Sequence, residues 1–362
     1  MVDNTKISPN QFTVLFTLFV IGDTILFIPA NVTVLAKQDA WISALLASVL
    51  GVLLVSLYSL LGNQFPSKNI IQIGEKVLGP WVGKMIGLLF ISFFFIDAGV
   101  ILWQLGDFMK TQIMPETPIQ AILILFLSII IMGTRLGIEV MARAAEIFLP
   151  WVLILFVVLI ISISPEIKFE NIQPVLEDGI KPLFGGTIPI MGYYLESVIL
   201  LMFFPYINQK SQATKAYISG MLIGSICLSI IIFLSITVLG ADLTNRNMYP
   251  SYAIAKKINI GNFFQRIEAL LAFIWYITLF FKLLICFYAT ILGLAQILKI
   301  NNQKIVTLPM GIILVNLSLI IVPNSPYFIK FVLSSWWAFT LSFGLFLPLF
   351  ILVISQLQKK NT

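Results

Sequence analysis

The chain has 362 residues, of which 59% are hydrophobic and only 10% are charged, and its formal net charge is +6. A soluble domain carries about 25% charged residues, so this composition excludes an ordinary soluble protein and indicates one that resides in a lipid bilayer. The sequence has no histidine, the usual proton shuttle and metal ligand. Cys227 and Cys286 both lie in apolar runs and are expected to be buried thiols rather than a disulfide or a metal site.

Ten segments are long and apolar enough to be membrane-spanning helices, each of which needs about 20 residues. In chain order they are about 8–36, 41–62, 81–107, 118–134, 144–163, 187–206, 214–240, 264–298, 305–323 and 333–357. The first has a clear start, with Ser8 as N-cap, Pro9 at the first helical position and Gln11 completing a capping box. The start "MVDNTKISPNQF" lacks the features of a signal peptide, so this segment is expected to remain in the mature protein. The connections are too short for a soluble domain, and we expect one integral membrane domain over residues 1–362.

Basic residues in the loops predict the orientation. With the N-terminus in the cytoplasm, the inner side carries 12 basic and 4 acidic residues, whereas the outer side carries 9 of each. Ten spans return the C-terminus to the cytoplasm. Tryptophans near the predicted span ends are expected to be interfacial anchors: Trp41, Trp81, Trp336 and Trp337.

Four ionisable residues lie deep inside predicted spans: Asp23, Asp97, Glu196 and Lys282. A charge at the centre of a bilayer helix costs about 2.5–3.5 kcal/mol on insertion scales, so such residues face a protein interior or a water-filled cavity. One interpretation is a structural ion pair that fastens two helices. For the set of four, we favour a shared polar site near the midplane of the membrane.

The first and sixth spans carry similar interruptions, "IGDTILFIP" and "PIMGYYLESVILLMFFP". Each has a glycine at mid-membrane, Gly22 or Gly192, followed by polar residues and an apolar run that ends in Pro29 or Pro205. Helices interrupted at matching positions of two halves indicate a transporter-type binding site, because unwound backbone at membrane depth is tolerated only where it lines a cavity or is buried in protein. The alternative is that a glycine only permits close helix packing. We favour this alternative for three others: Gly51, Gly87 and Gly224.

No nucleophile with an adjacent base and no phosphate-binding loop occurs in the sequence, which therefore indicates neither an enzyme, nor a cofactor, nor a nucleic-acid partner. The longer outer connection 242–262, "DLTNRNMYPSYAIAKKINIGN", is the best candidate for a gate. Its part "YPSYAIAKKI" can form a short helix over the mouth of a cavity. The alternative is a solvated connector.

Several stretches carry a family resemblance: "ISPNQFTVLFTLFVIGDTILFIPA" (7–30), "FPSKNIIQIGEKVLGPWVGK" (65–84), "GIEVMARAAEIFLPW" (137–151) and "GYYLESVILLMFFP" (192–205). In this order they resemble the B subunits of bacterial endospore germinant receptors, which are similar to permeases of the amino acid–polyamine–organocation superfamily. The resemblance covers nearly the whole chain. It implies an all-α, leucine-transporter-like fold of two inverted five-helix repeats, with spans 1 and 6 broken around a small-molecule site.

The resemblance also implies a function and a set of ligand-binding residues. Family members sense a nutrient, typically an amino acid, in a complex with an A subunit and a lipoprotein C subunit, at the inner membrane of the spore. The implied ligand-binding residues are Gly22, Asp23, Thr24, Asp97, Gly192, Tyr193, Tyr194, Glu196, Thr278 and Lys282. Free N–H groups at half-helix N-termini suit a carboxylate, and an acid such as Glu196 suits an ammonium group. Lys282 can take the place of a coupling sodium ion.

Three functions remain open at this point. The first is a sensor that passes a conformational change to partner subunits, and the resemblance favours it. The second is a proton-coupled amino-acid transporter of the same fold, with Asp23, Glu196 or Lys282 carrying the proton. The third is a membrane scaffold whose buried charges only hold helices together. Fold-level analogy alone does not separate the first two.

Overall fold

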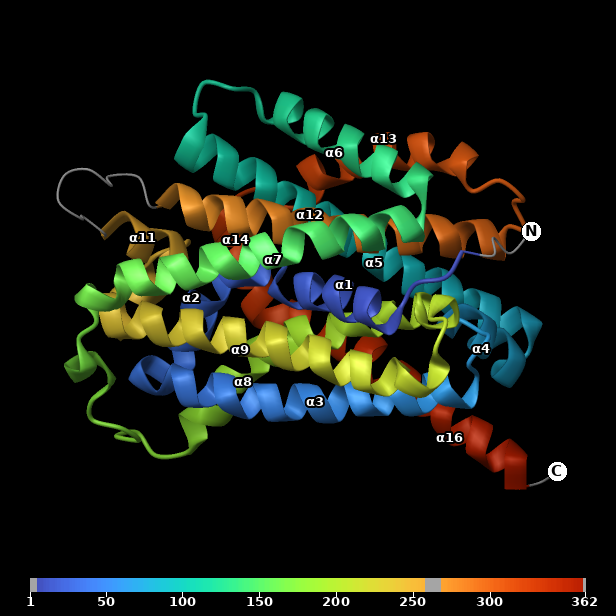
Figure 1. The fold of residues 1–362 in the computed structure, drawn as a ribbon, viewed down its shortest axis with the longest axis horizontal. Helices are drawn as coiled ribbons and strands as arrows, with labels where there is room; N and C mark the ends of the chain where they lie inside the picture. The colour runs from blue at the N-terminus through green and yellow to red at the C-terminus, as the bar shows by residue number, and fades with distance from the viewer. Residues whose placement is uncertain (1–4, 258–267, 361–362) are drawn as a thin grey trace.

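Long apolar helices run side by side along the longest axis of the molecule (Figure 1). The structure, a computed structural model, describes residues 5–257 and 268–360. The α-helices are α1 (Pro9–Ile21), α2 (Thr24–Ala36), α3 (Ala40–Gln64), α4 (Ile70–Leu78), α5 (Pro80–Phe108), α6 (Ile119–Leu136), α7 (Ile138–Ile163), α8 (Lys181–Leu195), α9 (Ala213–Leu239), α10 (Ala241–Arg246), α11 (Pro250–Lys257), α12 (Glu268–Ile297), α13 (Lys304–Ile321), α14 (Ser325–Phe331), α15 (Trp337–Leu341) and α16 (Leu347–Lys360).

Short 3₁₀ segments extend or connect these helices: η1 (Lys37–Asp39), η3 (Ser164–Glu166), η4 (Phe169–Ile172), η5 (Glu196–Met202), η6 (Phe204–Tyr206) and η7 (Lys210–Gln212). Three π-helical segments continue α-helices: η2 (Met109–Ile113), η8 (Val332–Trp336) and η9 (Ser342–Phe346). Two of them lie in the last long helix, between α14 and α16.

Nine helices in the described part of the chain are long and apolar enough to cross a membrane. All ten predicted segments have helical counterparts. The counts differ because α1 has only 13 residues and α2 continues through η1 into α3 as one helical stretch from Thr24 to Gln64. The predicted eighth segment is 264–298, and its first residues, 264–267, lie outside the described residues. Helix α7 begins at Ile138, before the predicted start of the fifth span near residue 144. Glu139 and Arg143 form an ion pair one turn apart on α7, so the charged stretch remains helical.

The predicted start of α1 is confirmed. Ser8 Oγ accepts a hydrogen bond from Gln11 N at 3.1 Å, and Gln11 Oε1 accepts one from Ser8 N at 2.9 Å. The same Gln11 side chain donates through Nε2 to Glu146 Oε2 at 3.0 Å. The cap of α1 therefore also fixes this helix to α7.

A parallel β-bridge joins Ile7 to Ile207. Ile7 N donates to Tyr206 O at 2.9 Å, and Asn208 N donates to Ile7 O at 3.0 Å. The residues that precede α1 are thereby paired with the residues that follow η6. Helix α1 starts and helix α16 finishes at the same end of the bundle, as Figure 1 shows.

The centre of the bundle holds α1 and α12, and its periphery includes α6 and α13. Helix α1 packs against α7, α9 and α12. In the most apolar part of α12, 78% of the residues are buried, against 22% for α13. The exposed side chains of the peripheral helices are large and apolar, as a lipid-facing surface requires.

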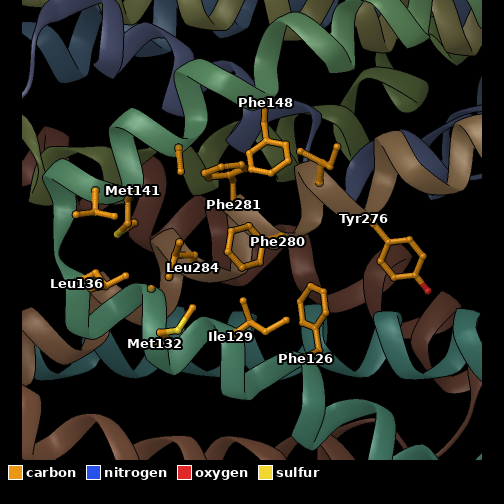
Figure 2. A pocket seen from close by; sticks show the side chains of 14 residues that line it. Phe126, Ile129, Met132, Leu136, Met141, Phe148, Tyr276, Phe280, Phe281 and Leu284 are labelled. Carbon is orange, nitrogen blue, oxygen red and sulfur yellow. The ribbon is translucent and has the colours of Figure 1, made fainter.

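Figure 2 shows an apolar pocket of about 390 Å³ between α6, α7 and α12. Phe280, Phe281 and Leu284 line it from α12. It contains none of the predicted ligand-binding residues. Thr278 and Lys282 of the same helix instead contact the break between α1 and α2. Helix α12 thus has one face toward this pocket and another toward the buried charges.

Candidate functional site

The first predicted span leaves the α-helix at Gly22 and Asp23, at the position that the sequence indicates. Gly22 has φ +32° and ψ −133°, a conformation that residues with a side chain rarely adopt. A Cβ at this position would lie 2.5 Å from Cδ of Lys282. A glycine is therefore needed here both for the backbone conformation and for the close approach of the lysine side chain.

Side chains of α12 bind the two carbonyl groups at the break, of which Asp23 O also accepts a hydrogen bond from Leu26 N of α2 at 3.4 Å. Gly22 O accepts a hydrogen bond from Thr278 Oγ1 at 2.9 Å, and Asp23 O accepts one from Trp275 Nε1 at 3.3 Å. Unwound backbone at membrane depth needs such partners. In this conformation the carbonyl groups of the break contact the protein itself, and Trp275 is a contact residue that the sequence analysis missed.

Lys282 lies between two carboxylates. Its Nζ is 2.6 Å from Asp23 Oδ1 and 2.6 Å from Glu196 Oε2, and all three side chains are at most 3% exposed. The rings of Phe19 and Tyr193 lie on further sides, each with its centroid 5.3 Å from Nζ. Such aromatic faces attract a cation. The lysine therefore joins the break in the first span to the sixth span, and both acids are its partners.

The change of helix type in the sixth span lies at Glu196 and not at Gly192. Residues up to Leu195 belong to α8, and the 3₁₀ segment η5 begins with Glu196. The expectation of a break at Gly192 is wrong, because this residue lies inside α8. A Cβ there would meet nothing closer than Thr340 Oγ1 at 3.8 Å. The tighter winding of η5 starts at the residue whose carboxylate contacts Lys282.

Trp336 binds the other oxygen of the Glu196 carboxylate. Its Nε1 donates a 2.7 Å hydrogen bond to Glu196 Oε1, and its side chain is 5% exposed and stacked on Phe93. The expectation that Trp336 is an interfacial anchor is wrong. Tryptophan suits both environments, since it combines a large apolar ring with one N–H donor, so its type alone gave no signal.

Asp97 lies beside this cluster rather than in it. Its Oδ2 accepts from Cys286 Sγ at 3.4 Å, and Cys286 lies one turn after Lys282 on α12. Asp97 is close enough to interact electrostatically with Lys282 and Asp23. Cys286 and Cys227 are buried and free, as predicted. Within residues 5–257 and 268–360, no group of three or more acidic or cysteine side chains could hold a metal ion.

Two other predicted contacts differ in position. Thr24 Oγ1 lies 3.5 Å from Asp23 Oδ1, at the edge of the cluster. Tyr194 lies on another side of α8 and packs against Gly51 of α3. A Cβ added to Gly51 would lie 2.9 Å from the ring of Tyr194. Gly51, Gly87 and Gly224 are the three glycines that the sequence assigns to close helix packing. Cβ atoms at Gly87 and Gly224 would also lie within 2.9 Å of neighbouring side chains, which agrees with that interpretation.

The predicted short helix of the outer connection corresponds to α11, and residues 258–262 of this connection lie outside the described residues. Ser251 Oγ donates to Ile25 O of α2 at 2.7 Å, and Tyr249 OH donates to Asp107 Oδ2 at 2.5 Å. Burial and the Asp107 carboxylate raise the pKa of Tyr249, so its hydroxyl stays protonated and remains a donor at neutral pH. The connection is therefore attached to α2 and α5.

The sequence is similar to known spore germination proteins. Residues 6–326 match the family described as "Spore germination protein". Spore germination protein KB of Bacillus subtilis (strain 168) is 28% identical over 365 residues, which cover 99% of this chain and 97% of that protein. Spore germination protein YndE of the same organism is 26% identical and covers 82% of both chains.

Two solved transporter structures share the fold. Mhp1, a nucleobase-cation-symport-1 family transporter in a closed conformation with bromovinylhydantoin bound, has a TM-score of 0.68 at 13% identity and covers 91% of this chain and 75% of its own. MhsT in complex with L-phenylalanine has a TM-score of 0.65 at 15% identity and covers 97% of this chain and 99% of its own. The all-helical membrane fold is therefore that of leucine-transporter-like proteins.

Proposed function

The chain belongs to the spore germination protein family, as a relative of its B subunits, and on this premise we propose that it senses a nutrient. It binds a small germinant, typically an amino acid, and passes a conformational change to the A and C subunits of a germinant receptor. We place it in the inner membrane of the spore with both termini in the cytoplasm, in keeping with the excess of basic residues on that side.

The observation that carries the proposal is the ion-paired lysine at the break of the first span. Lys282 contacts Asp23 and Glu196, which come from the first helices of the two proposed five-span inverted repeats. A bound amino acid offers a carboxylate to Lys282 and an ammonium group to an acid, so it can replace internal partners without leaving a buried charge alone. Tyr193 and Thr278 would lie at this site. The related fold of MhsT holds L-phenylalanine, which supports an amino acid as the ligand class.

The exchange of ion-pair partners gives the ligand a way to shift a conformational equilibrium. Because Lys282 joins the α1–α2 break to the start of η5, a ligand between them changes how the first and sixth spans are held together. A ligand shifts such an equilibrium only through different affinities for the two states. An ammonium group at Lys282 also supplies the positive charge that a coupling sodium ion would bring.

A proton-coupled amino-acid transporter of the same fold is the alternative. Uptake of labelled amino acids into proteoliposomes that contain the chain tests it, and sustained uptake would contradict the sensor proposal. Thermal stabilisation by an amino acid separates both functions from a scaffold, which has no ligand to bind. A germination screen of a deletion strain against single amino acids, nucleosides and sugars identifies the nutrient.

A further inference from the structure

A second, polar pocket of about 330 Å³ lies at the end of the bundle opposite to the start of α1. The last turn of α5 and segment η2 form one wall, the residues from Asn247 to Lys256 form another, and Ser325 of α14 completes it. Its volume is in the range of small-molecule sites. It contains none of the residues of the buried charge cluster.

The pocket holds an acid and a base that do not neutralise each other. Asp107 accepts from two hydroxyl groups, Tyr249 OH at 2.5 Å and Ser325 Oγ at 3.1 Å, which carry no charge. Lys256 Nζ donates to the amide oxygen of Gln112 at 3.1 Å. In the part of the chain that the structure describes, neither charge has an ion-pair partner.

Both groups keep capacity for a ligand. A carboxylate has about four acceptor sites, of which Asp107 uses two, and an ammonium group has three donors, of which Lys256 uses one for Gln112. The Lys256 ammonium also lies 4.5 Å from the ring centroid of Tyr252, which orients it along the pocket wall. Charge-assisted hydrogen bonds to such groups are stronger than neutral ones.

We propose that this pocket is a separate outer binding site for a zwitterionic amino acid, with the ligand ammonium on Asp107 and the ligand carboxylate on Lys256. Met248 and Ala253 also line the pocket and offer an apolar surface for the ligand side chain. The ammonium group of the ligand takes the acceptor sites of Asp107 that Tyr249 and Ser325 leave open. The bound ligand then bridges α5 and the outer connection, since Asp107 lies on α5 and Lys256 on α11.

An aromatic layer separates this site from the buried charges. The ring of Phe108 lies 5.2 Å from that of Tyr249, 5.1 Å from that of Tyr252 and 4.8 Å from that of Trp275. Trp275 in turn donates to the carbonyl of Asp23. The outer site is thus distinct from the proposed germinant site, and its occupancy is measurable on its own.

The test uses the purified full chain and saturation-transfer NMR with leucine, leucine methyl ester and N-acetylleucine. The ester lacks the carboxylate and the acetyl derivative lacks the ammonium group, so both are expected to bind at least tenfold more weakly than leucine. Lys256→Gln and Asp107→Asn are each expected to weaken leucine binding by a similar factor. Lys257→Gln is the matched control, because Lys257 bonds to Val238 O and lies outside the pocket.

Leucine binding that is unchanged in both pocket variants would overturn the proposal, as would equal binding of all three compounds. Glu196→Gln separates this proposal from the function of the central site. Binding that is lost in Lys256→Gln and kept in Glu196→Gln supports the outer site, whatever the central site does. Binding that is lost only in Glu196→Gln supports the central site and overturns the outer one.

Discussion

Trp336 donates its indole hydrogen to Glu196, and the bond of 2.7 Å joins the last long helix to the start of η5. The carboxylate has one oxygen on this indole and the other on Lys282. A buried carboxylate needs a partner for each of its two oxygens, since a buried charged oxygen without a partner carries a large desolvation cost. The tryptophan therefore fixes the orientation in which Glu196 meets the lysine.

Replacing Trp336 with phenylalanine is expected to destabilise the protein by about 1.5–3 kcal/mol, because a hydrogen bond to a charged group is lost while the aromatic ring remains. Thermal unfolding of the purified protein measures this. Trp337→Phe is the control, since the neighbouring tryptophan is half-buried and does not bond to Glu196. Equal unfolding temperatures of the two variants would show that the bond contributes nothing.

Lys282→Met is expected to be more damaging than Asp23→Asn or Glu196→Gln. The lysine variant leaves two acids facing each other, whereas each acid variant leaves one ion pair intact. Removing one partner of a buried pair costs about 3–5 kcal/mol. Protein abundance and unfolding temperature provide the measurement.

A double variant tests whether Glu196 and Lys282 are energetically coupled. Glu196→Gln with Lys282→Met is expected to recover part of the loss of the lysine variant, because fewer uncompensated charges remain. Strictly additive losses would argue that the two residues act independently. Asp23 would then be the principal partner of the lysine.

Gly22→Ala is expected to abolish or alter the nutrient response, and Gly22→Val more so, while the protein still reaches the membrane. The added Cβ would lie 2.5 Å from the Lys282 side chain, and φ of +32° disfavours any side chain. Gly192→Ala is the matched control, because its Cβ has free space inside α8. Nutrient-triggered germination with membrane immunoblots is the assay, and a normal response of Gly22→Val would count against the role of the break.

Tyr249→Phe is expected to shift the nutrient concentration that gives a half-maximal response without lowering abundance. The variant removes the hydroxyl that binds Asp107 and keeps the ring that packs on Phe108. Changes at Tyr252 are expected to act in the same direction. Tyr327→Phe controls for loss of a tyrosine hydroxyl outside the pocket, and indistinguishable dose-response curves of Tyr249→Phe and Tyr327→Phe would refute the prediction.

Loss of either partner subunit is expected to abolish the response and to destabilise this chain. The connections between its spans are short, and in the proposed sensor function the conformational change passes to other subunits. Spores that lack the A or the C subunit provide the test, with germination and immunoblots as readouts. If the chain stays abundant and nutrient-responsive without these subunits, the receptor proposal is wrong and the transporter that acts alone remains as the alternative.

The sequence was informative where a residue violates the rules of an apolar helix. Asp23 and Lys282 stand out because charge is costly at membrane depth, and Gly22 stands out because it directly precedes one of these charges. The structure brings all three together. The sequence did not reveal which acid pairs with the lysine, because the partners lie on spans far apart in the chain. Both Asp23 and Glu196 pair with Lys282. The packing of α12 against the break defines this arrangement.

The sequence is misleading where a residue type fits two environments. Gly192 has the pattern of a break, but an α-helix accommodates glycine without leaving the helical conformation. The change to 3₁₀ geometry at Glu196 has no sequence signal of its own. Trp336 was interpreted from its distance to a span end, which says nothing about whether its N–H faces the lipid interface or a buried acid.

The β-bridge at Ile7 has a consequence for measuring motion in this protein. Because Ile7 is bonded to both Tyr206 and Asn208, the start of α1 is held against the end of η6 and the residues that follow it. A spin label attached at Lys6 is then expected to report the displacement of that segment as well as that of α1. Paired with a second label on α5, it offers a distance that changes only when these paired segments rotate against the rest of the bundle.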